Sequence, residues 1–146
     1  MKIRLNKFLY ILINIVLPIF LGSFIYLIYR SEEILLFSWL NILGVDDFIN
    51  FFRKNIFLDS RAPLWFKYNL QDGLWVYSLN SFMLLIWENE LSSSNIYYFL
   101  LFPFLACLIE GLQFFQLLSG TYDSLDILFY LICGFIPILF FLKKMI

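Results

Sequence analysis

The residues best suited to chemistry lie in and just after a long apolar stretch near the C-terminal end of the chain. Glu110 and Gln113 are three residues apart within the stretch Ile96–Leu118, and Asp123 and Asp126 follow with the same spacing. Residues three apart share one face of a helix. A charged side chain at the centre of a bilayer costs about 2.5–3.5 kcal/mol, so it usually faces a partner or a wet cavity. We therefore expect this polar face to point into the protein.

Gln116 and Asp72 are two further polar positions near predicted helix ends or faces. Gln116 continues the polar face of Ile96–Leu118 by one more turn, and Asp126 begins the next apolar stretch, where a carboxylate can cap a helix. A hairpin of these two helices would gather the polar side chains near one membrane face. Asp72 opens an earlier apolar stretch, and we expect it to be the N-cap of that helix, where its charge is favourable.

Three functions fit such a cluster. In the first, Glu110 is hydrogen-bonded to Gln113 and Gln116 and holds helices together, or docks a second membrane protein or another copy of the chain. In the second, Glu110, Asp123 and Asp126 bind a divalent cation such as Mg²⁺ or Ca²⁺, which prefer oxygen ligands, or the headgroup of a lipid-linked molecule. In the third, the polar face is a proton or ion path. The structural or partner role is the first expectation.

Catalysis is the weaker expectation for this chain. Glu110 could serve as a general acid or base. However, the chain contains no histidine, and its sequence has no serine or cysteine paired with a base and no glycine-rich phosphate loop. We therefore expect a protein that is not an enzyme and that has no cofactor, apart from the divalent cation considered above.

Composition indicates an integral membrane protein. Hydrophobic residues make up 62% of the chain, aromatic residues 22% and charged residues only 14%. Soluble domains carry about 25% charged residues, and this chain cannot supply the polar surface that they need. Membrane lipids are the expected surroundings. The net charge of -1 gives no basic surface, so nucleic acid is not an expected partner.

Four stretches approach the roughly 20 residues that a helix needs to cross a bilayer. They are Phe8–Tyr29, Leu70–Trp87, Ile96–Leu118 and Leu125–Leu142. Because backbone groups cannot go unpaired in lipid and the stretches lack the alternation of barrel strands, helices are expected. The predicted fold is an all-α, polytopic transmembrane bundle in a single domain, residues 1–146. Cys107 and Cys133 fall inside predicted spans and are expected to pack as free thiols.

The region between the first two stretches is both apolar and charged. Gly44 is expected to end one apolar piece, and Asp46 or Asp47 to cap a second. Two short interfacial or re-entrant helices fit this pattern best. The alternative is a fifth span from Ile34 to Phe52, which would place two aspartates in the membrane.

The distribution of Lys and Arg gives a divided prediction of orientation. With four spans, the two termini share five basic residues on one side, and the long first loop carries five on the other. With five spans the division is seven against three, and basic residues favour the cytoplasmic side. Because the N-terminal basic residues flank the first span directly, we expect four spans with both termini in the cytoplasm and residues 120–126 on the outer face.

The C-terminal part of the chain resembles a known family. Glu110-x-x-Gln113, a short turn with Gly120, Asp123-x-x-Asp126 and Gly134 in the following helix are together similar to the VanZ-like membrane proteins. These are small polytopic helical proteins of bacteria. The resemblance implies a multi-pass protein of the cytoplasmic (inner) membrane with a link to the cell envelope and to glycopeptide resistance.

The chain departs from the VanZ-like pattern at two places. The family usually has an arginine in the turn, where this chain has Gly120-Thr121, and an asparagine four residues after the second aspartate, where this chain has Tyr130. The turn therefore lacks the cation that the resemblance leads one to expect beside the carboxylates.

Overall fold

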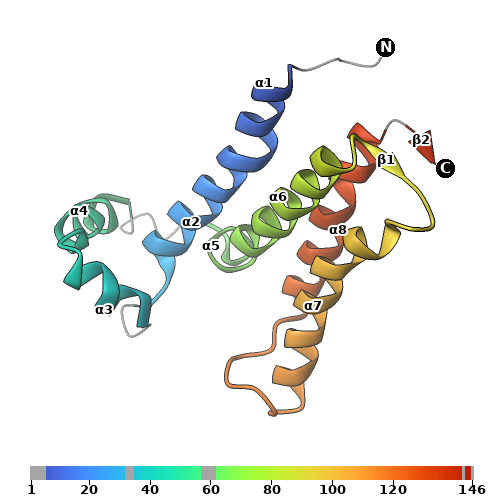
Figure 1. The fold of residues 1–146 in the computed structure, drawn as a ribbon. Helices are drawn as coiled ribbons and strands as arrows, with labels where there is room; N and C mark the ends of the chain where they lie inside the picture. Colours follow the sequence, from blue (N-terminus) through green and yellow to red (C-terminus); the bar gives the residue numbers. More distant parts are fainter. Residues whose placement is uncertain (1–5, 32–34, 57–61, 143, 146) are drawn as a thin grey trace.

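The computed structural model describes residues 6–31, 35–56, 62–142 and 144–145 and is mostly helical (Figure 1). The helices are α1 (Lys7–Ile11), the π-helical segment η1 (Leu12–Val16), α2 (Leu17–Tyr29), α3 (Leu35–Ile42), α4 (Asp46–Ile56), α5 (Leu64–Tyr68), α6 (Leu70–Ile86), α7 (Ile96–Phe114) and α8 (Ser124–Phe141). Two strands of two residues each, β1 (Glu90–Leu91) and β2 (Lys144–Met145), pair in parallel. The predicted helical character of the chain is confirmed.

Within the residues that the structure describes, three helices are long and apolar enough to cross a membrane. They are the continuous run α1, η1 and α2 (Lys7–Tyr29), α7, and α8. The helix α6 has 17 residues. At 1.5 Å per residue it spans about 25 Å, against about 30 Å of hydrocarbon core. These three helices are compatible with a membrane protein. The predicted fourth span, at α6, is shorter than the other three.

The third predicted span ends earlier than expected. The helix α7 stops at Phe114, because Gln116 adopts a positive φ of 57° and reverses the chain. The Gln116 N–H donates to the Gln113 carbonyl, and the Leu117 N–H donates to the Leu112 carbonyl, both at 2.9 Å. These two hydrogen bonds form a Schellman motif, which satisfies carbonyls in the last turn of the helix. The prediction that the helix reaches Leu118 is therefore wrong.

Between α2 and α6 the described residues form three short helices in place of the two expected: α3 and α4, which meet at Gly44, and then α5. Gly44 has φ 68°, and its N–H donates to the Asn41 carbonyl while the Val45 N–H donates to the Leu40 carbonyl. A glycine adopts this backbone conformation without steric cost, so α3 ends where the sequence predicts. The alternative of one continuous span from Ile34 to Phe52 is therefore wrong for the described residues, because the helix is interrupted between Ile42 and Asp46.

The helix α6 is the centre of the bundle. It packs against both α2 and α8 and lies between them in the view of Figure 1. Glycines permit the close approach: a Cβ on Gly73 would lie 2.8 Å from the Cys133 Sγ, and one on Gly22 would lie 2.8 Å from the Trp75 Nε1. Small residues allow helices to pack closely where lipid gives no hydrophobic drive.

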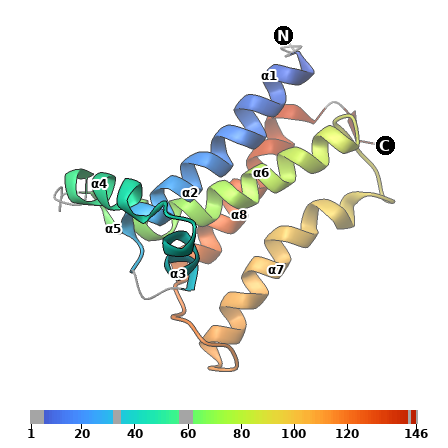
Figure 2. The ribbon, with the colours of Figure 1, turned by 60° about the vertical axis from the view of Figure 1, so that its left-hand side comes forward.

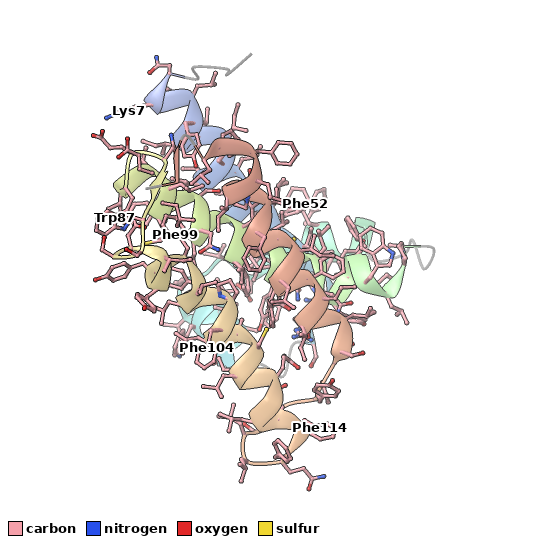
Figure 3. All side chains as sticks on the ribbon, turned by 90° about the vertical axis from the view of Figure 1, so that its right-hand side faces the viewer. Lys7, Phe52, Trp87, Phe99, Phe104 and Phe114 are labelled. Carbon is pink, nitrogen blue, oxygen red and sulfur yellow. The ribbon has the colours of Figure 1, made fainter. Side chains whose placement is uncertain are left out.

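The bundle buries polar side chains and exposes apolar ones. On α7, Phe99 is 1% exposed, whereas Phe104 is 63% exposed (Figure 3). Buried polar and charged residues are Asn14, Asn69, Gln71, Ser78, Asn80, Ser81, Asn95, Glu110 and Asp126. Soluble monomers rarely expose apolar patches of such extent. This distribution is the one expected when lipid is the surrounding solvent.

Candidate functional site

Four helix ends meet at one end of the bundle. The helices α2 and α7 end there, and α6 and α8 begin there (Figure 1). Asn69, at the junction of α5 and α6, is 1% exposed. Its Nδ2 donates to the Asp123 Oδ2 at 2.8 Å and to the Asp126 Oδ1 at 2.7 Å. Both amide hydrogens of one asparagine therefore join the start of α6 to the start of α8.

Glu110 adds α7 to this junction. It is 4% exposed, and its Oε2 accepts a hydrogen bond of 3.2 Å from the Asp123 backbone N–H. Asp123 in turn caps α8, since its Oδ1 accepts from the Leu125 N–H at 2.9 Å. The predicted cap at Asp126 is therefore wrong by three residues: Asp126 lies in the first turn of α8, 8% exposed, and faces Asn69.

Asp72 completes the group, which we call the carboxyl cluster: Asp72, Glu110, Asp123 and Asp126, together with Asn69. Asp72 interacts electrostatically with Glu110 and Asp126. It lies in the first turn of α6, and Asn69 occupies the N-cap position. The prediction that Asp72 caps this helix is therefore wrong, although its place at the positive end of the helix is as expected.

A cation from a distant part of the chain lies near the carboxyl cluster. Arg30 follows directly after α2 and interacts electrostatically with Asp72, Glu110 and Asp126. Its guanidinium also lies over the Tyr26 ring, 5.5 Å from the centroid. Sequence analysis did not identify Arg30, because 42 residues separate it from Asp72 and no local pattern connects them.

The two glutamines of the prediction lie apart from this hydrogen-bonded core. Gln113 is half-buried, and its side-chain amide packs against Gly120, where an added Cβ would lie 2.6 Å from the Nε2. Gln116 is exposed in the turn after α7. The continuation of the polar face through Gln116 depended on a longer helix, so Gln116 is not part of the cluster.

Sequence analysis also missed a second polar contact zone, between the first helix and α6. The Tyr77 hydroxyl donates to the Asn14 Oδ1 at 2.6 Å, and the Ser78 hydroxyl donates to the Ile15 carbonyl at 2.8 Å. Both acceptors lie in η1, the π-helical segment before Pro18. Asparagines inside apolar stretches were the available signal, since a polar side chain in lipid must find a partner.

The residues of the cluster can bind protons, hydrogen-bond donors and cations. Among the residues described, no three His, Cys, Asp or Glu side chains lie close enough together to hold a metal ion. Among the described residues, Arg30 is the cation that interacts electrostatically with Asp72, Glu110 and Asp126, so acidic groups outnumber basic ones in this part of the structure. Cys107 and Cys133 are both free thiols.

Comparison of the chain with protein-family models, with curated proteins and with solved structures gave no match.

Proposed function

We propose that this chain is a multi-pass protein of the bacterial cytoplasmic membrane in which the carboxyl cluster closes one end of a four-helix bundle, so that the chain serves as a structural or partner subunit. The observation that carries this proposal is the placement of Asn69. It is 1% exposed and donates to two carboxylates of α8. Because both amide hydrogens of Asn69 are bonded to these carboxylates, the amide links the two helix ends and has no hydrogen left to donate to a ligand.

The position of α6 supports a fourth membrane crossing. It packs against α2 and α8, runs antiparallel to α2 and parallel to α8, and alternates in direction with α2 and α7, the helices before and after it among the long ones (Figures 1 and 2). Trp87 follows its last residue, and aromatic rings prefer the interfacial layer. Its polar residues Gln71, Asn80 and Ser81 are buried. With α6 as a span, both described ends of the chain fall on one side, and α3 and α4 lie at the opposite interface.

The likeness to VanZ-like proteins is also part of the proposal. The residues of the resemblance that bear charge, Glu110, Asp123 and Asp126, belong to one hydrogen-bonded group through Asn69. Arg30 supplies a cation beside the carboxylates, although it comes from the end of α2 and not from the turn. The spatial convergence of Glu110, Asp123 and Asp126 supports the proposed likeness.

Substitution of Glu110 tests the structural role. Glu110→Gln keeps an acceptor for the Asp123 N–H and removes one acidic group from a crowded set, so stability in detergent should be unchanged or higher. Glu110→Leu removes the acceptor and should lower the free energy of unfolding by about 1–3 kcal/mol. The exposed Glu88→Gln is the matched control and should have no effect.

A second candidate function is favoured by the excess of carboxyl groups over Arg30. In that case the cluster binds a cationic group, such as the amine of a lipid-linked headgroup. Glu110→Gln would then leave folding and assembly intact but abolish the cellular phenotype of the protein. That outcome would overturn the structural proposal, whereas equal effects on stability and phenotype across both Glu110 variants support it.

A further inference from the structure

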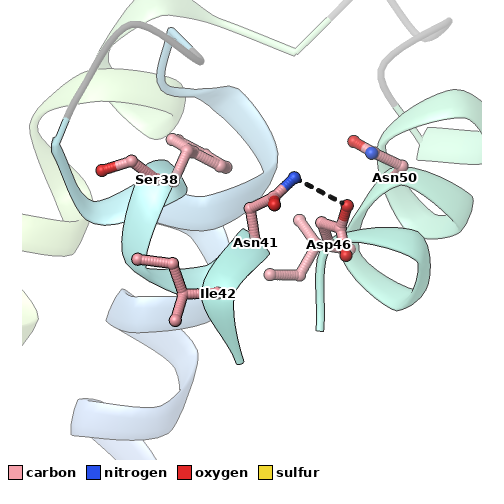
Figure 4. Close-up of a pocket in the computed structure, with 7 residues that line it drawn as sticks. Ser38, Asn41, Ile42, Asp46 and Asn50 are labelled. Atoms are coloured by element: carbon pink, nitrogen blue, oxygen red, sulfur yellow. Dashed lines mark hydrogen bonds between the residues drawn. The ribbon is translucent and has the colours of Figure 1, made fainter. Parts of the chain in front are cut away.

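A cavity of about 520 Å³ lies between α3 and α4, away from the carboxyl cluster. Its walls are Phe37, Ser38, Asn41 and Ile42 on α3, and Asp46, Ile49 and Asn50 on α4. Figure 4 shows Ser38, Asn41 and Ile42 on one side and Asp46 and Asn50 on the other. Small-molecule sites commonly measure about 300–1,000 Å³ and combine apolar walls with a few polar groups. The cavity has both properties.

The charge in this cavity is negative. Asp46 is the one charged side chain among the described residues that line it, and its Oδ2 accepts from the Asn41 Nδ2 at 3.1 Å. The amide of Asn41 therefore orients the carboxylate. Carboxylates bind ammonium groups through short, charge-assisted hydrogen bonds. A cationic group is the complementary ligand.

Arg53, a cation in the last turn of α4, is engaged with α2. The Arg53 Nη1 donates to the Leu27 carbonyl at 2.8 Å and to the Arg30 carbonyl at 2.9 Å. Its guanidinium also lies over the Phe37 ring, 5.0 Å from the centroid. Cations are favoured at helix C-termini, where carbonyls lack intrahelical partners. Arg53 is thus engaged with carbonyls at the end of α2, and Asp46 is the charged side chain among the described residues that line the cavity.

The surroundings of the cavity are apolar and exposed. Ile42 is 82% exposed, Leu43 is 72% exposed and Phe48 is 63% exposed. These side chains flank the turn between α3 and α4, next to the cavity. Amphipathic helices that lie at a membrane interface insert such residues among acyl chains. The ligand should therefore combine an amine with acyl chains.

We propose that the cavity between α3 and α4 binds the headgroup of a phospholipid that carries a primary amine, as in phosphatidylethanolamine. Asp46 binds the ammonium group, and the Asn50 amide is available to a phosphate oxygen. Ile42 and Leu43 contact the acyl chains. This site is separate from the carboxyl cluster, so the two proposals can fail independently.

Native mass spectrometry of the full chain in detergent tests the proposal. The protein is titrated with phosphatidylethanolamine, phosphatidylcholine or phosphatidylglycerol of identical acyl chains. We expect one phosphatidylethanolamine to be retained at a concentration about tenfold lower than the other two lipids, since hydrogen bonds to charged groups contribute strongly. Equal retention of all three lipids, or a preference for phosphatidylglycerol, would overturn the proposal.

Two neighbouring aspartates provide a matched pair of variants. Asp46→Asn keeps the size of the residue but removes its charge, so the preference for phosphatidylethanolamine should disappear. Asp47→Asn changes an exposed carboxylate outside the cavity and should keep the preference. If Asp46→Asn does not fold, Asn50→Leu removes the amide that faces the phosphate oxygen, and unchanged retention of phosphatidylethanolamine in that variant would contradict the site.

Discussion

At the scale of single residues, the carboxyl cluster depends on one buried amide, that of Asn69, which bridges two carboxylates. Asn69 has one amide nitrogen with two hydrogens, and each hydrogen has a carboxylate acceptor within 2.8 Å. A leucine of similar size cannot make either bond. Because the acceptors Asp123 and Asp126 belong to another helix, the loss would act on packing between helices and not only on the local turn.

Asn69→Leu should therefore lower the free energy of unfolding by about 2–3 kcal/mol, the sum expected for two hydrogen bonds to charged groups in a partly relaxed site. Detergent-solubilised protein unfolded by SDS, followed by circular dichroism, would measure the change. Asn95→Leu is the control: Asn95 is 3% exposed, but its bonds to Ser92 and Glu90 remain within one turn. An equal loss in both variants would contradict a bridging role for Asn69.

The core of the cluster could be predicted from the sequence only in part. The spacing of Glu110, Asp123 and Asp126 predicted a shared location, and the structure brings them together through local connections of α7 and α8. Asn69 and Arg30 could not be predicted, since their partners are more than 40 residues away. Gln116 was misplaced because a non-glycine residue with positive φ ends α7, and the sequence carries no glycine at that point to signal it.

At the scale of elements, close approach of helices depends on Gly134. A Cβ at this position would lie 2.8 Å from the Pro103 Cγ and 3.3 Å from the Val76 Cγ1. A proline ring on α7 cannot rotate away as a flexible side chain would. Gly134→Ala should therefore separate α8 from α7 and lower the free energy of unfolding by about 1–3 kcal/mol, the usual cost of overpacking.

Gly111→Ala is the matched control for that prediction. Gly111 lies in α7, and a Cβ there would meet nothing within 4 Å. Alanine favours helix over glycine by about 0.5–1 kcal/mol, so stability should stay constant or rise. If both alanine variants behave alike in the same unfolding assay, steric contact at Gly134 is not what limits the packing of α8.

The polar zone between the first helix and α6 allows a second test at this scale. Tyr77→Phe and Asn14→Leu each remove one side of a 2.6 Å hydrogen bond. A double-mutant cycle should give a coupling free energy of about 0.5–1.5 kcal/mol, within the range measured for bonds between membrane helices. Tyr77→Phe combined with Asn69→Leu should be additive, since distant sites act independently. Additivity in the first cycle would mean that the bond contributes nothing to helix association.

The elements themselves were more predictable than their contacts. The end of α3 at Gly44 was predictable from a single residue. Its φ of 68° is a conformation that glycine adopts without steric cost, and glycines are therefore common at helix ends. The π-helical segment η1 was not anticipated. It precedes Pro18, which has no N–H to donate, and no apolar pattern distinguishes such a segment from an ordinary helical turn.

At the scale of the whole molecule, the number of crossings decides where every polar group lies. If α6 crosses the membrane, residue 31 after α2 and residue 119 after α7 lie on one side, and residue 93 before α7 lies on the other. If α6 does not cross, residues 31 and 93 share a side and residue 119 lies opposite. The described fold, with α6 between α2 and α8, favours the first arrangement.

Single cysteines can separate these arrangements. In a Cys107→Ser, Cys133→Ser background, Ser31→Cys, Ser93→Cys and Ser119→Cys place one thiol at three exposed positions. With both termini in the cytoplasm, an impermeant maleimide should label positions 31 and 119 in intact cells and position 93 only after permeabilisation. Labelling of 31 and 93 from one side would remove the fourth crossing. Labelling of 93 alone in intact cells would keep four crossings but turn the carboxyl cluster toward the cytoplasm, where a lipid-linked substrate of the outer leaflet could not reach it.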